Sequence, residues 1–373
     1  MRVLHFYRTS FSDTHGGTEV FMNQLALAGR PLGIEAEVLS LSRDGSYGSD
    51  NSLGYTVHRV PRQFEVASNS VSLRAFSKFA ELADSFDIIH YHFPWPFMDL
   101  VHFATRSRKP SIVTYHSDII RQSIILKLYR PLMHKFLGSV DRIVSTSENY
   151  FRTSDTLQRF SSKVSVIPIG LDAETYPEPA AERLEYWRGR LGSKFFLFIG
   201  VLRYYKGLHI LLEAARERDW PIVIVGAGPV EGELREEIAR YSLTNIHLLG
   251  FVSDEDKSAL YNLSRAVVFP SYLRSEAFGI TLVEGAMYGR PLVSTEIGTG
   301  TSFVNSHNET GFVIPPSDAA SLRSTLDVLW GDNDLCDRLG AGARSRFEEH
   351  FTASQMAQSY LTLYQGLQVQ GST

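Results

Sequence analysis

Cysteine is nearly absent from the 373-residue sequence, which contains only Cys336. A single cysteine excludes an internal disulfide and is typical of a protein that works in a reducing compartment. Long apolar runs are absent too, since no stretch reaches the roughly 20 residues that a membrane-spanning helix needs. Residues 1–8 contain too few apolar side chains for a signal peptide. The sequence therefore predicts a cytoplasmic protein.

An excess of charge of one sign is also missing, because 37 Lys and Arg oppose 41 Asp and Glu. The formal net charge of −4 gives no overall attraction to nucleic acid, and we expect no nucleic-acid partner. The charge is unevenly distributed, however. Between Arg106 and Arg142 there are eight Lys and Arg but only two acids, Asp118 and Asp141. This bias predicts a locally basic surface in the N-terminal half.

The length and the spacing of apolar runs indicate two α/β domains. A chain of this length exceeds what a single core usually organises. Short apolar runs alternate with helical patterns, which is typical of parallel sheets covered by helices. The strands expected in the first half are 3–7, 36–41, 55–60, 87–91, 111–115, 141–145 and 164–167. Those expected in the second half are 195–200, 222–225, 245–251, 266–269 and 311–314.

Polar residues gather where the expected strands of the first half end. Gly16 and Gly17 follow the first strand, and adjacent glycines let a ligand approach the backbone. His90 and His92 lie at the end of the strand 87–91, and His116 directly follows the strand 111–115. Ligands of open α/β sheets bind outside the carboxyl ends of strands. An ordinary turn at the glycines and structural roles for the histidines are the alternatives.

The stretch 269–294 carries two carboxylates around a strand-to-helix junction. Glu276 lies in a polar loop, Gly279 opens a helix, and Glu284 lies inside that helix. The first N–H groups of a helix have no partner and favour anions. A helix-capping role would explain Glu276 alone. Glu284 has apolar neighbours, where an unpaired charge is costly, so we expect a ligand site around both carboxylates.

Cations follow the first strand of the second half. Arg203 and Lys206 lie between the strand 195–200 and a helix, and cations at such a place suit a diphosphate. Further on, Asp254 and Asp256 form a D-x-D pattern, which holds a metal in some transferases. A helix start with acids in its first turn explains this pattern fully, so we predict no metal site.

The spacing of Glu276 and Glu284, with Phe278-Gly279 between them, resembles the signature of the retaining nucleotide-sugar glycosyltransferases of family 4. The run V-I-P-I-G-L-D at 166–172 resembles that family's domain-crossing segment. The resemblance implies a GT-B fold of class α/β, in which two Rossmann-like parallel-sheet domains face a cleft. It implies an acceptor domain at 1–175 and a nucleotide-sugar domain at 176–353. The final helix, 354–373, would pack back on the first domain.

The resemblance also implies a role for each candidate residue. Glu276 and His116 would be the catalytic residues, both near the donor sugar. The substrate-binding residues would be Gly16, Gly17, Arg203, Lys206, Val252, Phe278, Gly279 and Glu284. Among them, Glu284 would bind the ribose and Val252 would lie near the base. The family has an arginine where this chain has Val201, so Arg203 is expected as its substitute, with a surface arginine as the alternative.

The reaction implied by the resemblance is hexose transfer from a nucleoside-diphosphate sugar. The runs L-R-Y-Y-K-G and R-S-E-A-F-G-I-T-L-V-E-G resemble bacterial mannosyl- and rhamnosyltransferases of surface-polysaccharide (O-antigen) synthesis. We therefore expect GDP-mannose as the donor, with UDP-sugars as the alternative, a lipid-linked or oligosaccharide acceptor, and no metal cofactor. Two other functions fit the same carboxylates: a glycoside hydrolase or phosphorylase, and a non-catalytic sugar-binding protein.

A basic amphipathic helix is expected at 119–137, with a restart or kink at Pro131. At 100° per residue its apolar face would hold Ile124, Leu128, Leu132 and Phe136, opposite Lys127, Arg130 and His134. Helices of this kind either cover a core or dock on anionic lipid. Peripheral contact with the inner face of the plasma membrane is therefore one interpretation, and a purely structural helix is the other.

Overall fold

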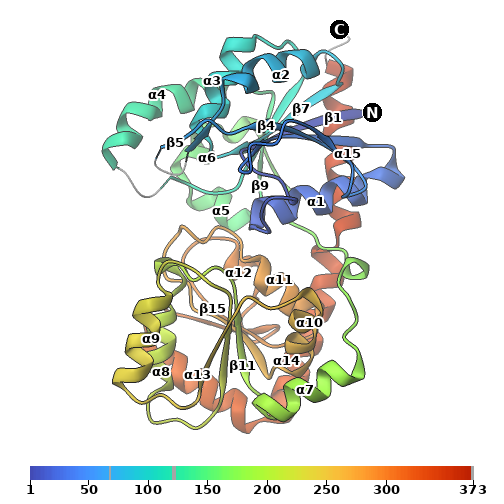
Figure 1. Cartoon of the computed structure of the whole chain (residues 1–373). Coiled ribbons are helices and arrows are strands. Elements are labelled where there is room, and N and C mark those ends of the chain that lie inside the picture. The colour runs from blue at the N-terminus through green and yellow to red at the C-terminus, as the bar shows by residue number, and fades with distance from the viewer. Residues whose placement is uncertain (67–68, 120–122, 371–373) are drawn as a thin grey trace. The chain divides into compact units, whose positions relative to one another are not determined.

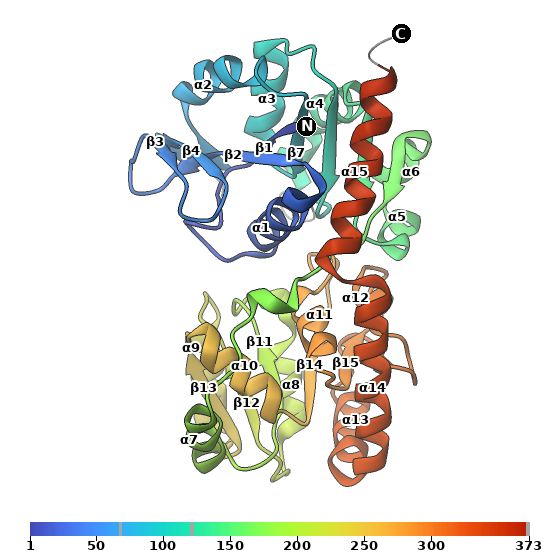
Figure 2. The ribbon, with the colours of Figure 1, turned by 90° about the vertical axis from the view of Figure 1, so that its right-hand side faces the viewer.

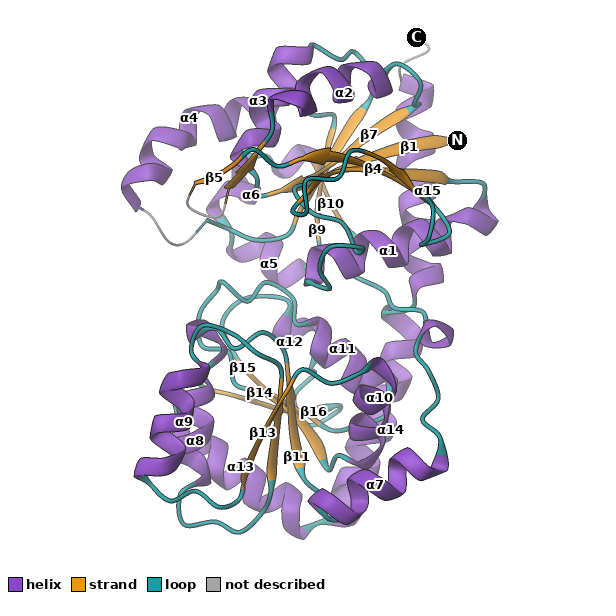
Figure 3. Cartoon of the chain, viewed as in Figure 1, coloured by secondary structure: helices purple, strands orange, loops and turns teal. Residues whose placement is uncertain are grey.

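A computed structural model of the chain describes residues 1–66, 69–119 and 123–370. The chain forms two compact units, the first made of Met1–Leu171 and Thr352–Thr373 and the second of Asp172–Phe351. In each unit helices cover both faces of a mainly parallel sheet (Figure 3). The prediction of two Rossmann-like α/β domains is thereby confirmed.

The first unit is built on an eight-stranded sheet with the order β10-β9-β8-β7-β1-β2-β4-β3. Its strands are β1 (Arg2–Phe6), β2 (Glu35–Ser42), β3 (Gly48–Asp50), β4 (Thr56–Pro61), β7 (Ile88–Phe93), β8 (Ser111–Tyr115), β9 (Arg142–Ser145) and β10 (Val164–Val166). Only the edge strand β3 runs antiparallel to its neighbour. A separate small hairpin pairs β5 (Phe64–Val66) with β6 (Asn69–Val71).

Alternation within the central strands divides their side chains between the two faces of the sheet. On one face Phe6 of β1 and Tyr91 of β7 pack against Phe79, a residue of the helix α2. On the other face His90 and His92 lie under the edge of Phe21, a residue of α1. The two faces therefore differ, since one is apolar and the other carries a buried row of histidines.

The helices of this unit include the last one of the chain. They are α1 (Gly17–Gly29), η1 (Arg30–Leu32), α2 (Leu73–Ala83), α3 (Pro96–Thr105), α4 (Ser123–Ser139), α5 (Glu148–Thr153), α6 (Asp155–Arg159), η2 (Ser161–Lys163) and α15 (Ala353–Gln370). α15 packs beside α1 (Figure 2). Tyr364 of α15 meets His90 of β7 at 2.7 Å, and Tyr360 meets Thr114 of β8 at 2.8 Å. Buried hydrogen bonds thus join the C-terminal helix to the N-terminal sheet.

The helix α4 corresponds to the expected basic helix at 119–137. Residues 120–122 of that range lie outside the described residues, as does the side chain of Ile124. Of the two alternatives expected at Pro131, a kink or a restart, the restart is wrong, because α4 continues through this residue. Within the described part of the chain, no helix is both long and apolar enough to cross a membrane.

The expected apolar face of α4 is wrong at Leu128, whose side chain is 81% exposed. Phe136 is buried as expected, and among the described side chains of α4 it is joined by Met133 and Leu137. Tyr129 lies on the same side and donates a 2.5 Å hydrogen bond to Asp99, a buried residue of α3. This packing against α3 rotates the buried face away from Leu128, which the helical pattern alone did not reveal.

The second unit has a six-stranded parallel sheet with the order β13-β12-β11-β14-β15-β16. The strands are β11 (Phe196–Ile199), β12 (Ile222–Val225), β13 (Ile246–Gly250), β14 (Ala266–Phe269), β15 (Leu292–Thr295) and β16 (Gly311–Ile314). All residues of β11, β12, β14 and β15 are buried, which agrees with the continuous apolar sequences of the first three. This order is that of a doubly wound dinucleotide-type fold.

Helices cover the second sheet on both faces (Figure 1). They are η3 (Ala173–Thr175), α7 (Ala181–Leu191), η4 (Tyr204–Lys206), α8 (Leu208–Ala215), α9 (Glu231–Arg240), α10 (Asp254–Leu263), α11 (Ile280–Met287), α12 (Thr301–Val304), α13 (Ala319–Gly331) and α14 (Asn333–His350). α8 packs between α9 and α13, whereas α11 packs on α14.

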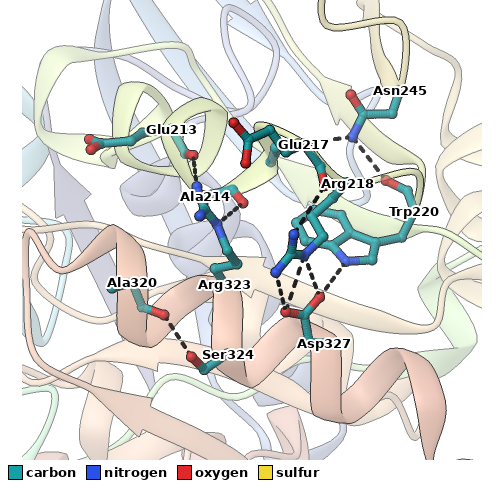
Figure 4. Close-up of polar contacts among 11 residues, drawn as sticks. Glu213, Ala214, Glu217, Arg218, Trp220, Asn245, Ala320, Arg323, Ser324 and Asp327 are labelled. Atoms are coloured by element: carbon teal, nitrogen blue, oxygen red, sulfur yellow. Dashed lines mark hydrogen bonds and ion pairs between the residues drawn. The ribbon is translucent and has the colours of Figure 1, made fainter.

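A polar cluster holds α13 to the segment that leads into β12 (Figure 4). Asp327 of α13 accepts three hydrogen bonds from Arg218, at 2.9, 3.2 and 3.0 Å, and one from the indole of Trp220 at 3.0 Å. Arg323, one turn earlier, donates to the carbonyl oxygen of Ala214 at 3.0 Å. This cluster lies at the edge where β12 begins, so it leaves the carboxyl ends of the strands free for other roles.

Candidate active site

The second sheet has a topological switch point between β11 and β14. From β11 the chain continues to β12 and β13 on one side and then returns to β14 on the other side. Ligands of open α/β sheets bind in the crevice outside the carboxyl ends of the two strands at such a point. The loop after β11 carries Lys206, and the loop after β14 carries Glu276. Sequence-predicted residues therefore meet at this point of the sheet.

Lys206 and Glu276 form a short ion pair that joins the two loops. Their side chains are only 12% and 11% exposed. The ammonium of Lys206 also lies 4.4 Å from the centre of the Phe269 ring, at the end of β14. A charge in this setting is little screened by water, so it acts strongly on any anion that replaces the carboxylate.

The backbone keeps the two loops close together. Gly207 has a φ of 70°, and a Cβ at this position would collide with the carbonyl oxygen of Pro270. The N–H of Tyr272 donates to the carbonyl oxygen of Tyr205 at 3.0 Å. Glycine is thus required after Lys206, because any side chain would force the loops apart.

The start of α11 lies beside this ion pair. Gly279 precedes the helix in the left-handed region, with a φ of 87°, and offers no capping side chain. Among the described residues, the N–H groups of Ile280 and Thr281 have no hydrogen-bond partner. The hydroxyl of Thr281 donates to the carbonyl oxygen of Ile199, which ends β11, at 3.0 Å. Uncapped helical N–H groups therefore lie at the carboxyl end of β11, where they favour an anion.

Glu284 lies in the middle of α11 and has three hydrogen-bond partners among the described residues, none of which also contacts Glu276. Its carboxylate accepts hydrogen bonds from Lys257 at 3.1 Å, Tyr176 at 3.0 Å and Tyr261 at 2.6 Å. Burial, and then the charge of Glu284, raise the pKa of the Tyr261 hydroxyl well above its usual value. Glu284 thus links α11 to α10 in this structure, and three of the roughly four acceptor positions of its carboxylate are used.

Three further predicted residues lie near the carboxyl ends of the strands. Arg203 is exposed and lines a cavity of about 230 Å³ between α8 and α9, and its guanidinium forms no hydrogen bond or ion pair with any described residue. Val252 is partly exposed and follows Phe251, whose ring is 84% exposed. Phe278 is 4% exposed and packs on Phe351, so only its backbone can contact a ligand.

The D-x-D pattern serves the start of α10, as predicted. Ser253 caps this helix by accepting a hydrogen bond from the N–H of Asp256 at 3.1 Å. The Asp256 carboxylate accepts a hydrogen bond from Trp187 at 2.8 Å and pairs with Arg183 at 3.0 Å. Arg183 also donates to the other carboxylate oxygen at 3.3 Å, so both oxygen atoms of Asp256 are used in holding α7 to α10.

In the first unit, the predicted glycines lie at the start of α1. Gly16 precedes the helix with an extended backbone, and Gly17 is its first residue. The carboxylate of Glu19 lies against Gly16 and accepts a hydrogen bond from Thr9. Burial raises the pKa of Glu19 above its usual value. The absence of a side chain at Gly16 thus leaves room for the Glu19 carboxylate.

His116 follows β8 and is the partly exposed member of a buried histidine group. Its Nε2 lies 3.1 Å from Nδ1 of His92, and Nε2 of His92 lies 3.0 Å from Nδ1 of His5. Burial lowers the pKa of His116 and of His5 to about 3, so both rings are neutral at physiological pH. This group lies at the switch point of the first sheet, between β1 and β7.

Nitrogen atoms of His5, His90 and His92 lie within 4.8 Å of one another, a spacing that a metal ion would fit. The ring arrangement does not suit a metal, because the planes of His90 and His92 are stacked with centres 4.5 Å apart. Both nitrogens of His90 are engaged, by Tyr364 and by Thr114, at 2.7 Å each. These rings are therefore arranged as a hydrogen-bonded stack.

Sequence reasoning missed His5 and the partners of Glu284. His5 lies within an apolar strand, and its contacts with His90 and His92 arise only from the pairing of β1 with β7, which the sequence pattern does not give. Lys257 and Tyr261 are four residues apart and so share one face of α10. A buried carboxylate requires such partners. A cation and a hydroxyl four residues apart on a nearby helix were therefore the signal in the sequence that could have identified them.

Two family models match the chain, one for each half. The model for glycosyltransferase family 4 matches residues 15–175, and the model for glycosyl transferases group 1 matches residues 187–346. The chain is 55% identical to the D-rhamnosyltransferase WbpZ of Pseudomonas aeruginosa, over 95% of this chain and 93% of that protein. It is 48% identical to the O-antigen chain mannosyltransferase C of Escherichia coli, over 98% of both chains.

Solved structures share the fold at low sequence identity. A sucrose-phosphate synthase from Thermosynechococcus elongatus has a TM-score of 0.80 at 18% identity and covers 98% of both chains. Anabaena HepE, in complex with UDP and glucose, has a TM-score of 0.78 at 19% identity and covers 97% of this chain and 98% of its own. Given these models and relatives, the chain belongs to the family 4 glycosyltransferases and has the GT-B fold.

Proposed function

We propose that this glycosyltransferase transfers a manno-configured hexose from a nucleoside-diphosphate sugar, with GDP-mannose as the first candidate donor, and that it retains the anomeric configuration. Two extensively similar relatives are named as a D-rhamnosyltransferase and a mannosyltransferase. D-Rhamnose is 6-deoxymannose, so both names point to one ring configuration. The mannosyltransferase is named for the O-antigen chain, which supports the assembly of a bacterial surface polysaccharide as the role of this enzyme.

The observation that carries the proposal is the Lys206–Glu276 pair beside the uncapped start of α11. A donor diphosphate would take the place of the carboxylate next to Lys206 and accept hydrogen bonds from the N–H groups of Ile280 and Thr281. In such a site, stabilising the negative charge that develops on the leaving diphosphate contributes most of the rate enhancement. The family generally needs no metal for this step, and we propose none here.

Displacement from Lys206 would leave Glu276 free to bind hydroxyl groups of the donor sugar. Glu284 would bind the ribose through the acceptor position that its three partners leave open. Backbone groups at Phe278, Gly279 and Val252 would complete the nucleotide site. The exposed ring of Phe251 offers a surface on which a base can stack.

Arg203 is proposed as a second cation for the diphosphate, in place of the family arginine that is Val201 here. No described acid pairs with Arg203, so its guanidinium is available, and a planar guanidinium can bind two phosphate oxygens at once. In the first unit, Gly16, Gly17 and His116 are proposed to bind hydroxyl groups of a sugar substrate. His116 would do so through the nitrogen that does not face His92.

The acceptor is proposed to be lipid-linked or an oligosaccharide, reached at a membrane surface through α4. Leu128 is 81% exposed on this helix, and Lys127 and Arg130 beside it are exposed as well. An apolar side chain between two cations suits the headgroup region of an anionic bilayer. This arrangement supports peripheral binding to the inner face of the plasma membrane.

A thermal-shift series with GDP-mannose, GDP-D-rhamnose and UDP-glucose tests the donor assignment. A true donor stabilises the native protein by mass action, so it should raise the melting temperature at concentrations where the others do not. We expect the two GDP-sugars to act and UDP-glucose to be without effect. Stabilisation by UDP-glucose alone would contradict the proposal, as would release of free sugar without any need for the nucleotide.

A further inference from the structure

The sheet register of the first unit aligns four histidines and a threonine on one face. His5 pairs with His90, and His92 pairs with Thr114, while His116 follows Thr114 by two positions. His5, His90, His92 and Thr114 are fully buried. His116 is the member of this row that reaches the surface.

Three of the histidines form a single hydrogen-bonded chain. Nδ1 of His5 meets Nε2 of His92 at 3.0 Å, and Nδ1 of His92 meets Nε2 of His116 at 3.1 Å. At the inner end, Nε2 of His5 is buried and has no hydrogen-bond partner in the described part of the chain. At the outer end, Nδ1 of His116 has no partner among the described residues and is not among the atoms shut off from solvent.

A neutral imidazole has one N–H group and one lone pair. In each contact of this chain one ring must donate and the other must accept. Only two proton arrangements satisfy both contacts: Nδ1 carries the proton in all three rings, or Nε2 carries it in all three. The proton position of His116 is therefore tied to those of His92 and His5.

We propose that His5 and His92 are positioning residues for His116, which fix its ring orientation and its tautomer so that Nδ1 alone, with one defined hydrogen-bonding character, is presented to a sugar hydroxyl. This proposal rests on the proposed role of His116 in substrate binding. The two buried rings would act only through His116 and would not touch the substrate.

The inner end of the histidine chain is closed, which excludes proton transfer along it. A proton that arrived at His116 could not be passed on beyond His5, because no described residue accepts a hydrogen bond from Nε2 of His5. Burial also keeps the rings neutral, since it lowers the pKa of His92 well below its usual value and that of His116 to about 3. His116 therefore orients a hydroxyl by a hydrogen bond and does not act as a general base.

His90 provides an internal contrast. Its ring stacks on His92 with centres 4.5 Å apart, and it is equally buried. Its nitrogens, however, meet Thr114 and Tyr364 and do not join the chain that ends at His116. A substitution at His90 should therefore affect stability and leave the tautomer of His116 unchanged.

The direct test is two-bond ¹H–¹⁵N NMR on the full-length protein labelled with [¹⁵N]histidine, which reports the protonated nitrogen of each neutral ring. We expect His5, His92 and His116 each to show one tautomer, with the same nitrogen protonated in all three. In His92→Phe, which keeps a stacked ring but removes both nitrogens, His116 should become a mixture of tautomers. Different tautomers among the three rings, or an unchanged His116 in His92→Phe, would overturn the proposal.

Turnover of the donor, measured as release of the nucleoside diphosphate, distinguishes the positioning role of His5 and His92 from the role of His116 itself. We expect His92→Phe to lower kcat about tenfold with an unchanged KM for the donor, and His90→Phe to leave kcat within about twofold. Loss of activity in His116→Ala with native kcat in His92→Phe would overturn the proposal that His92 positions His116. Native kcat in His116→Ala, with coupled tautomers in the spectra, would instead overturn the proposed role of His116.

Discussion

The two units place different chemistry at the same position of similar sheets. At the switch point of the second sheet, Lys206 and Glu276 form a charged pair beside the uncapped start of α11. At the switch point of the first sheet, buried histidines are held neutral by their surroundings. Both positions are largely closed to water. The position in the second unit nevertheless holds two charges, whereas the position in the first unit holds neutral rings.

This difference matches the two kinds of group that a glycosyltransferase must bind. A diphosphate carries charge and requires cations and N–H donors. A sugar hydroxyl is neutral and requires oriented donors and acceptors, which a histidine of fixed tautomer supplies. We therefore attribute nucleotide binding to the second unit and hydroxyl recognition to the first. The predictions below test this division.

Acidification should give the largest difference between the two units, because it should destabilise the first unit more than the second. Burial holds the pKa of His5 and His116 near 3 and lowers those of His90 and His92 well below 6.5, so the unfolded chain binds more protons below pH 6.5. The stability that these rings contribute is present above pH 6.5 and is lost as the pH falls. Between pH 6.5 and 5 the rings of His5 and His116 should each cost about 1.5 kcal/mol, and His90 and His92 should add to this loss.

Hydrogen exchange followed peptide by peptide, and corrected for the intrinsic effect of pH, measures this loss in each unit. Peptides of β1, β7 and β8 should lose protection on acidification before those of β11 and β14. Equal loss of protection in both sheets would contradict the contrast between the units.

Removing the cations of the second unit should have the next largest effect. Lys206→Ala should lower kcat by about 10²- to 10³-fold, because one preorganised stabiliser of the leaving diphosphate is lost. Arg203→Ala should lower kcat by about 10²-fold, and Arg203→Lys should restore part of it, because a lysine cannot bind two oxygens in one plane. Arg240→Ala, which changes another exposed arginine, is the matched control and should remain near the native rate.

Steady-state kinetics with the donor found by thermal shift distinguishes the two cations. If Arg203→Ala stays within about threefold of the native rate while Lys206→Ala is inactive, Lys206 and the helix N–H groups are sufficient. Arg203 would then be a surface residue, and Val201 would mark a true departure from the family.

The Glu284→Gln substitution tests whether this carboxylate is structural as well as ligand-binding. It should lower the free energy of unfolding by about 2 kcal/mol, because Lys257 and Tyr261 lose a charged partner. Urea unfolding provides the measurement, with Glu236→Gln on the exposed side of α9 as the control. A loss below about 0.5 kcal/mol would show that the link between α10 and α11 contributes little.

Charge reversal on α4 should have the smallest effect, and it concerns membranes alone. Lys127→Glu with Arg130→Glu should weaken binding to anionic vesicles by about 1 kcal/mol for each cation removed, and more after reversal. Donor binding should be unchanged, since neither residue belongs to the proposed nucleotide site. Sedimentation with vesicles checks this, and absence of binding by the native protein at low salt would end the membrane proposal.

The sequence predicted the sheets well because their strands are buried runs of apolar residues. β12 and β14 lie where the apolar pattern placed them. The hairpin of β5 and β6 was missed, since three-residue strands leave no periodic signal. β15 was missed because it lies inside the stretch that was interpreted for its carboxylates. The buried face of α4 was misplaced, because packing on α3 decides it.

The candidate site was predictable in its residue types but not in its pairings. Lys206 and Glu276 were identified from two separate loops, yet only the sheet order brings those loops together. The partners of Glu284 come from α10 and from the start of the unit, which no local pattern connects. His5 resembled an ordinary strand residue, and its link to His92 depends on the register of β1 against β7.

The central claim is that the charged switch point of the second unit binds the nucleoside diphosphate. Calorimetric titration of GDP into the native protein, Lys206→Ala and His116→Ala tests it directly. The account predicts at least about tenfold weaker GDP binding in Lys206→Ala, while His116→Ala should stay within about twofold of native, since a charge-assisted contact is lost only in the first. Equal losses in both variants, or a larger loss in His116→Ala, would contradict it.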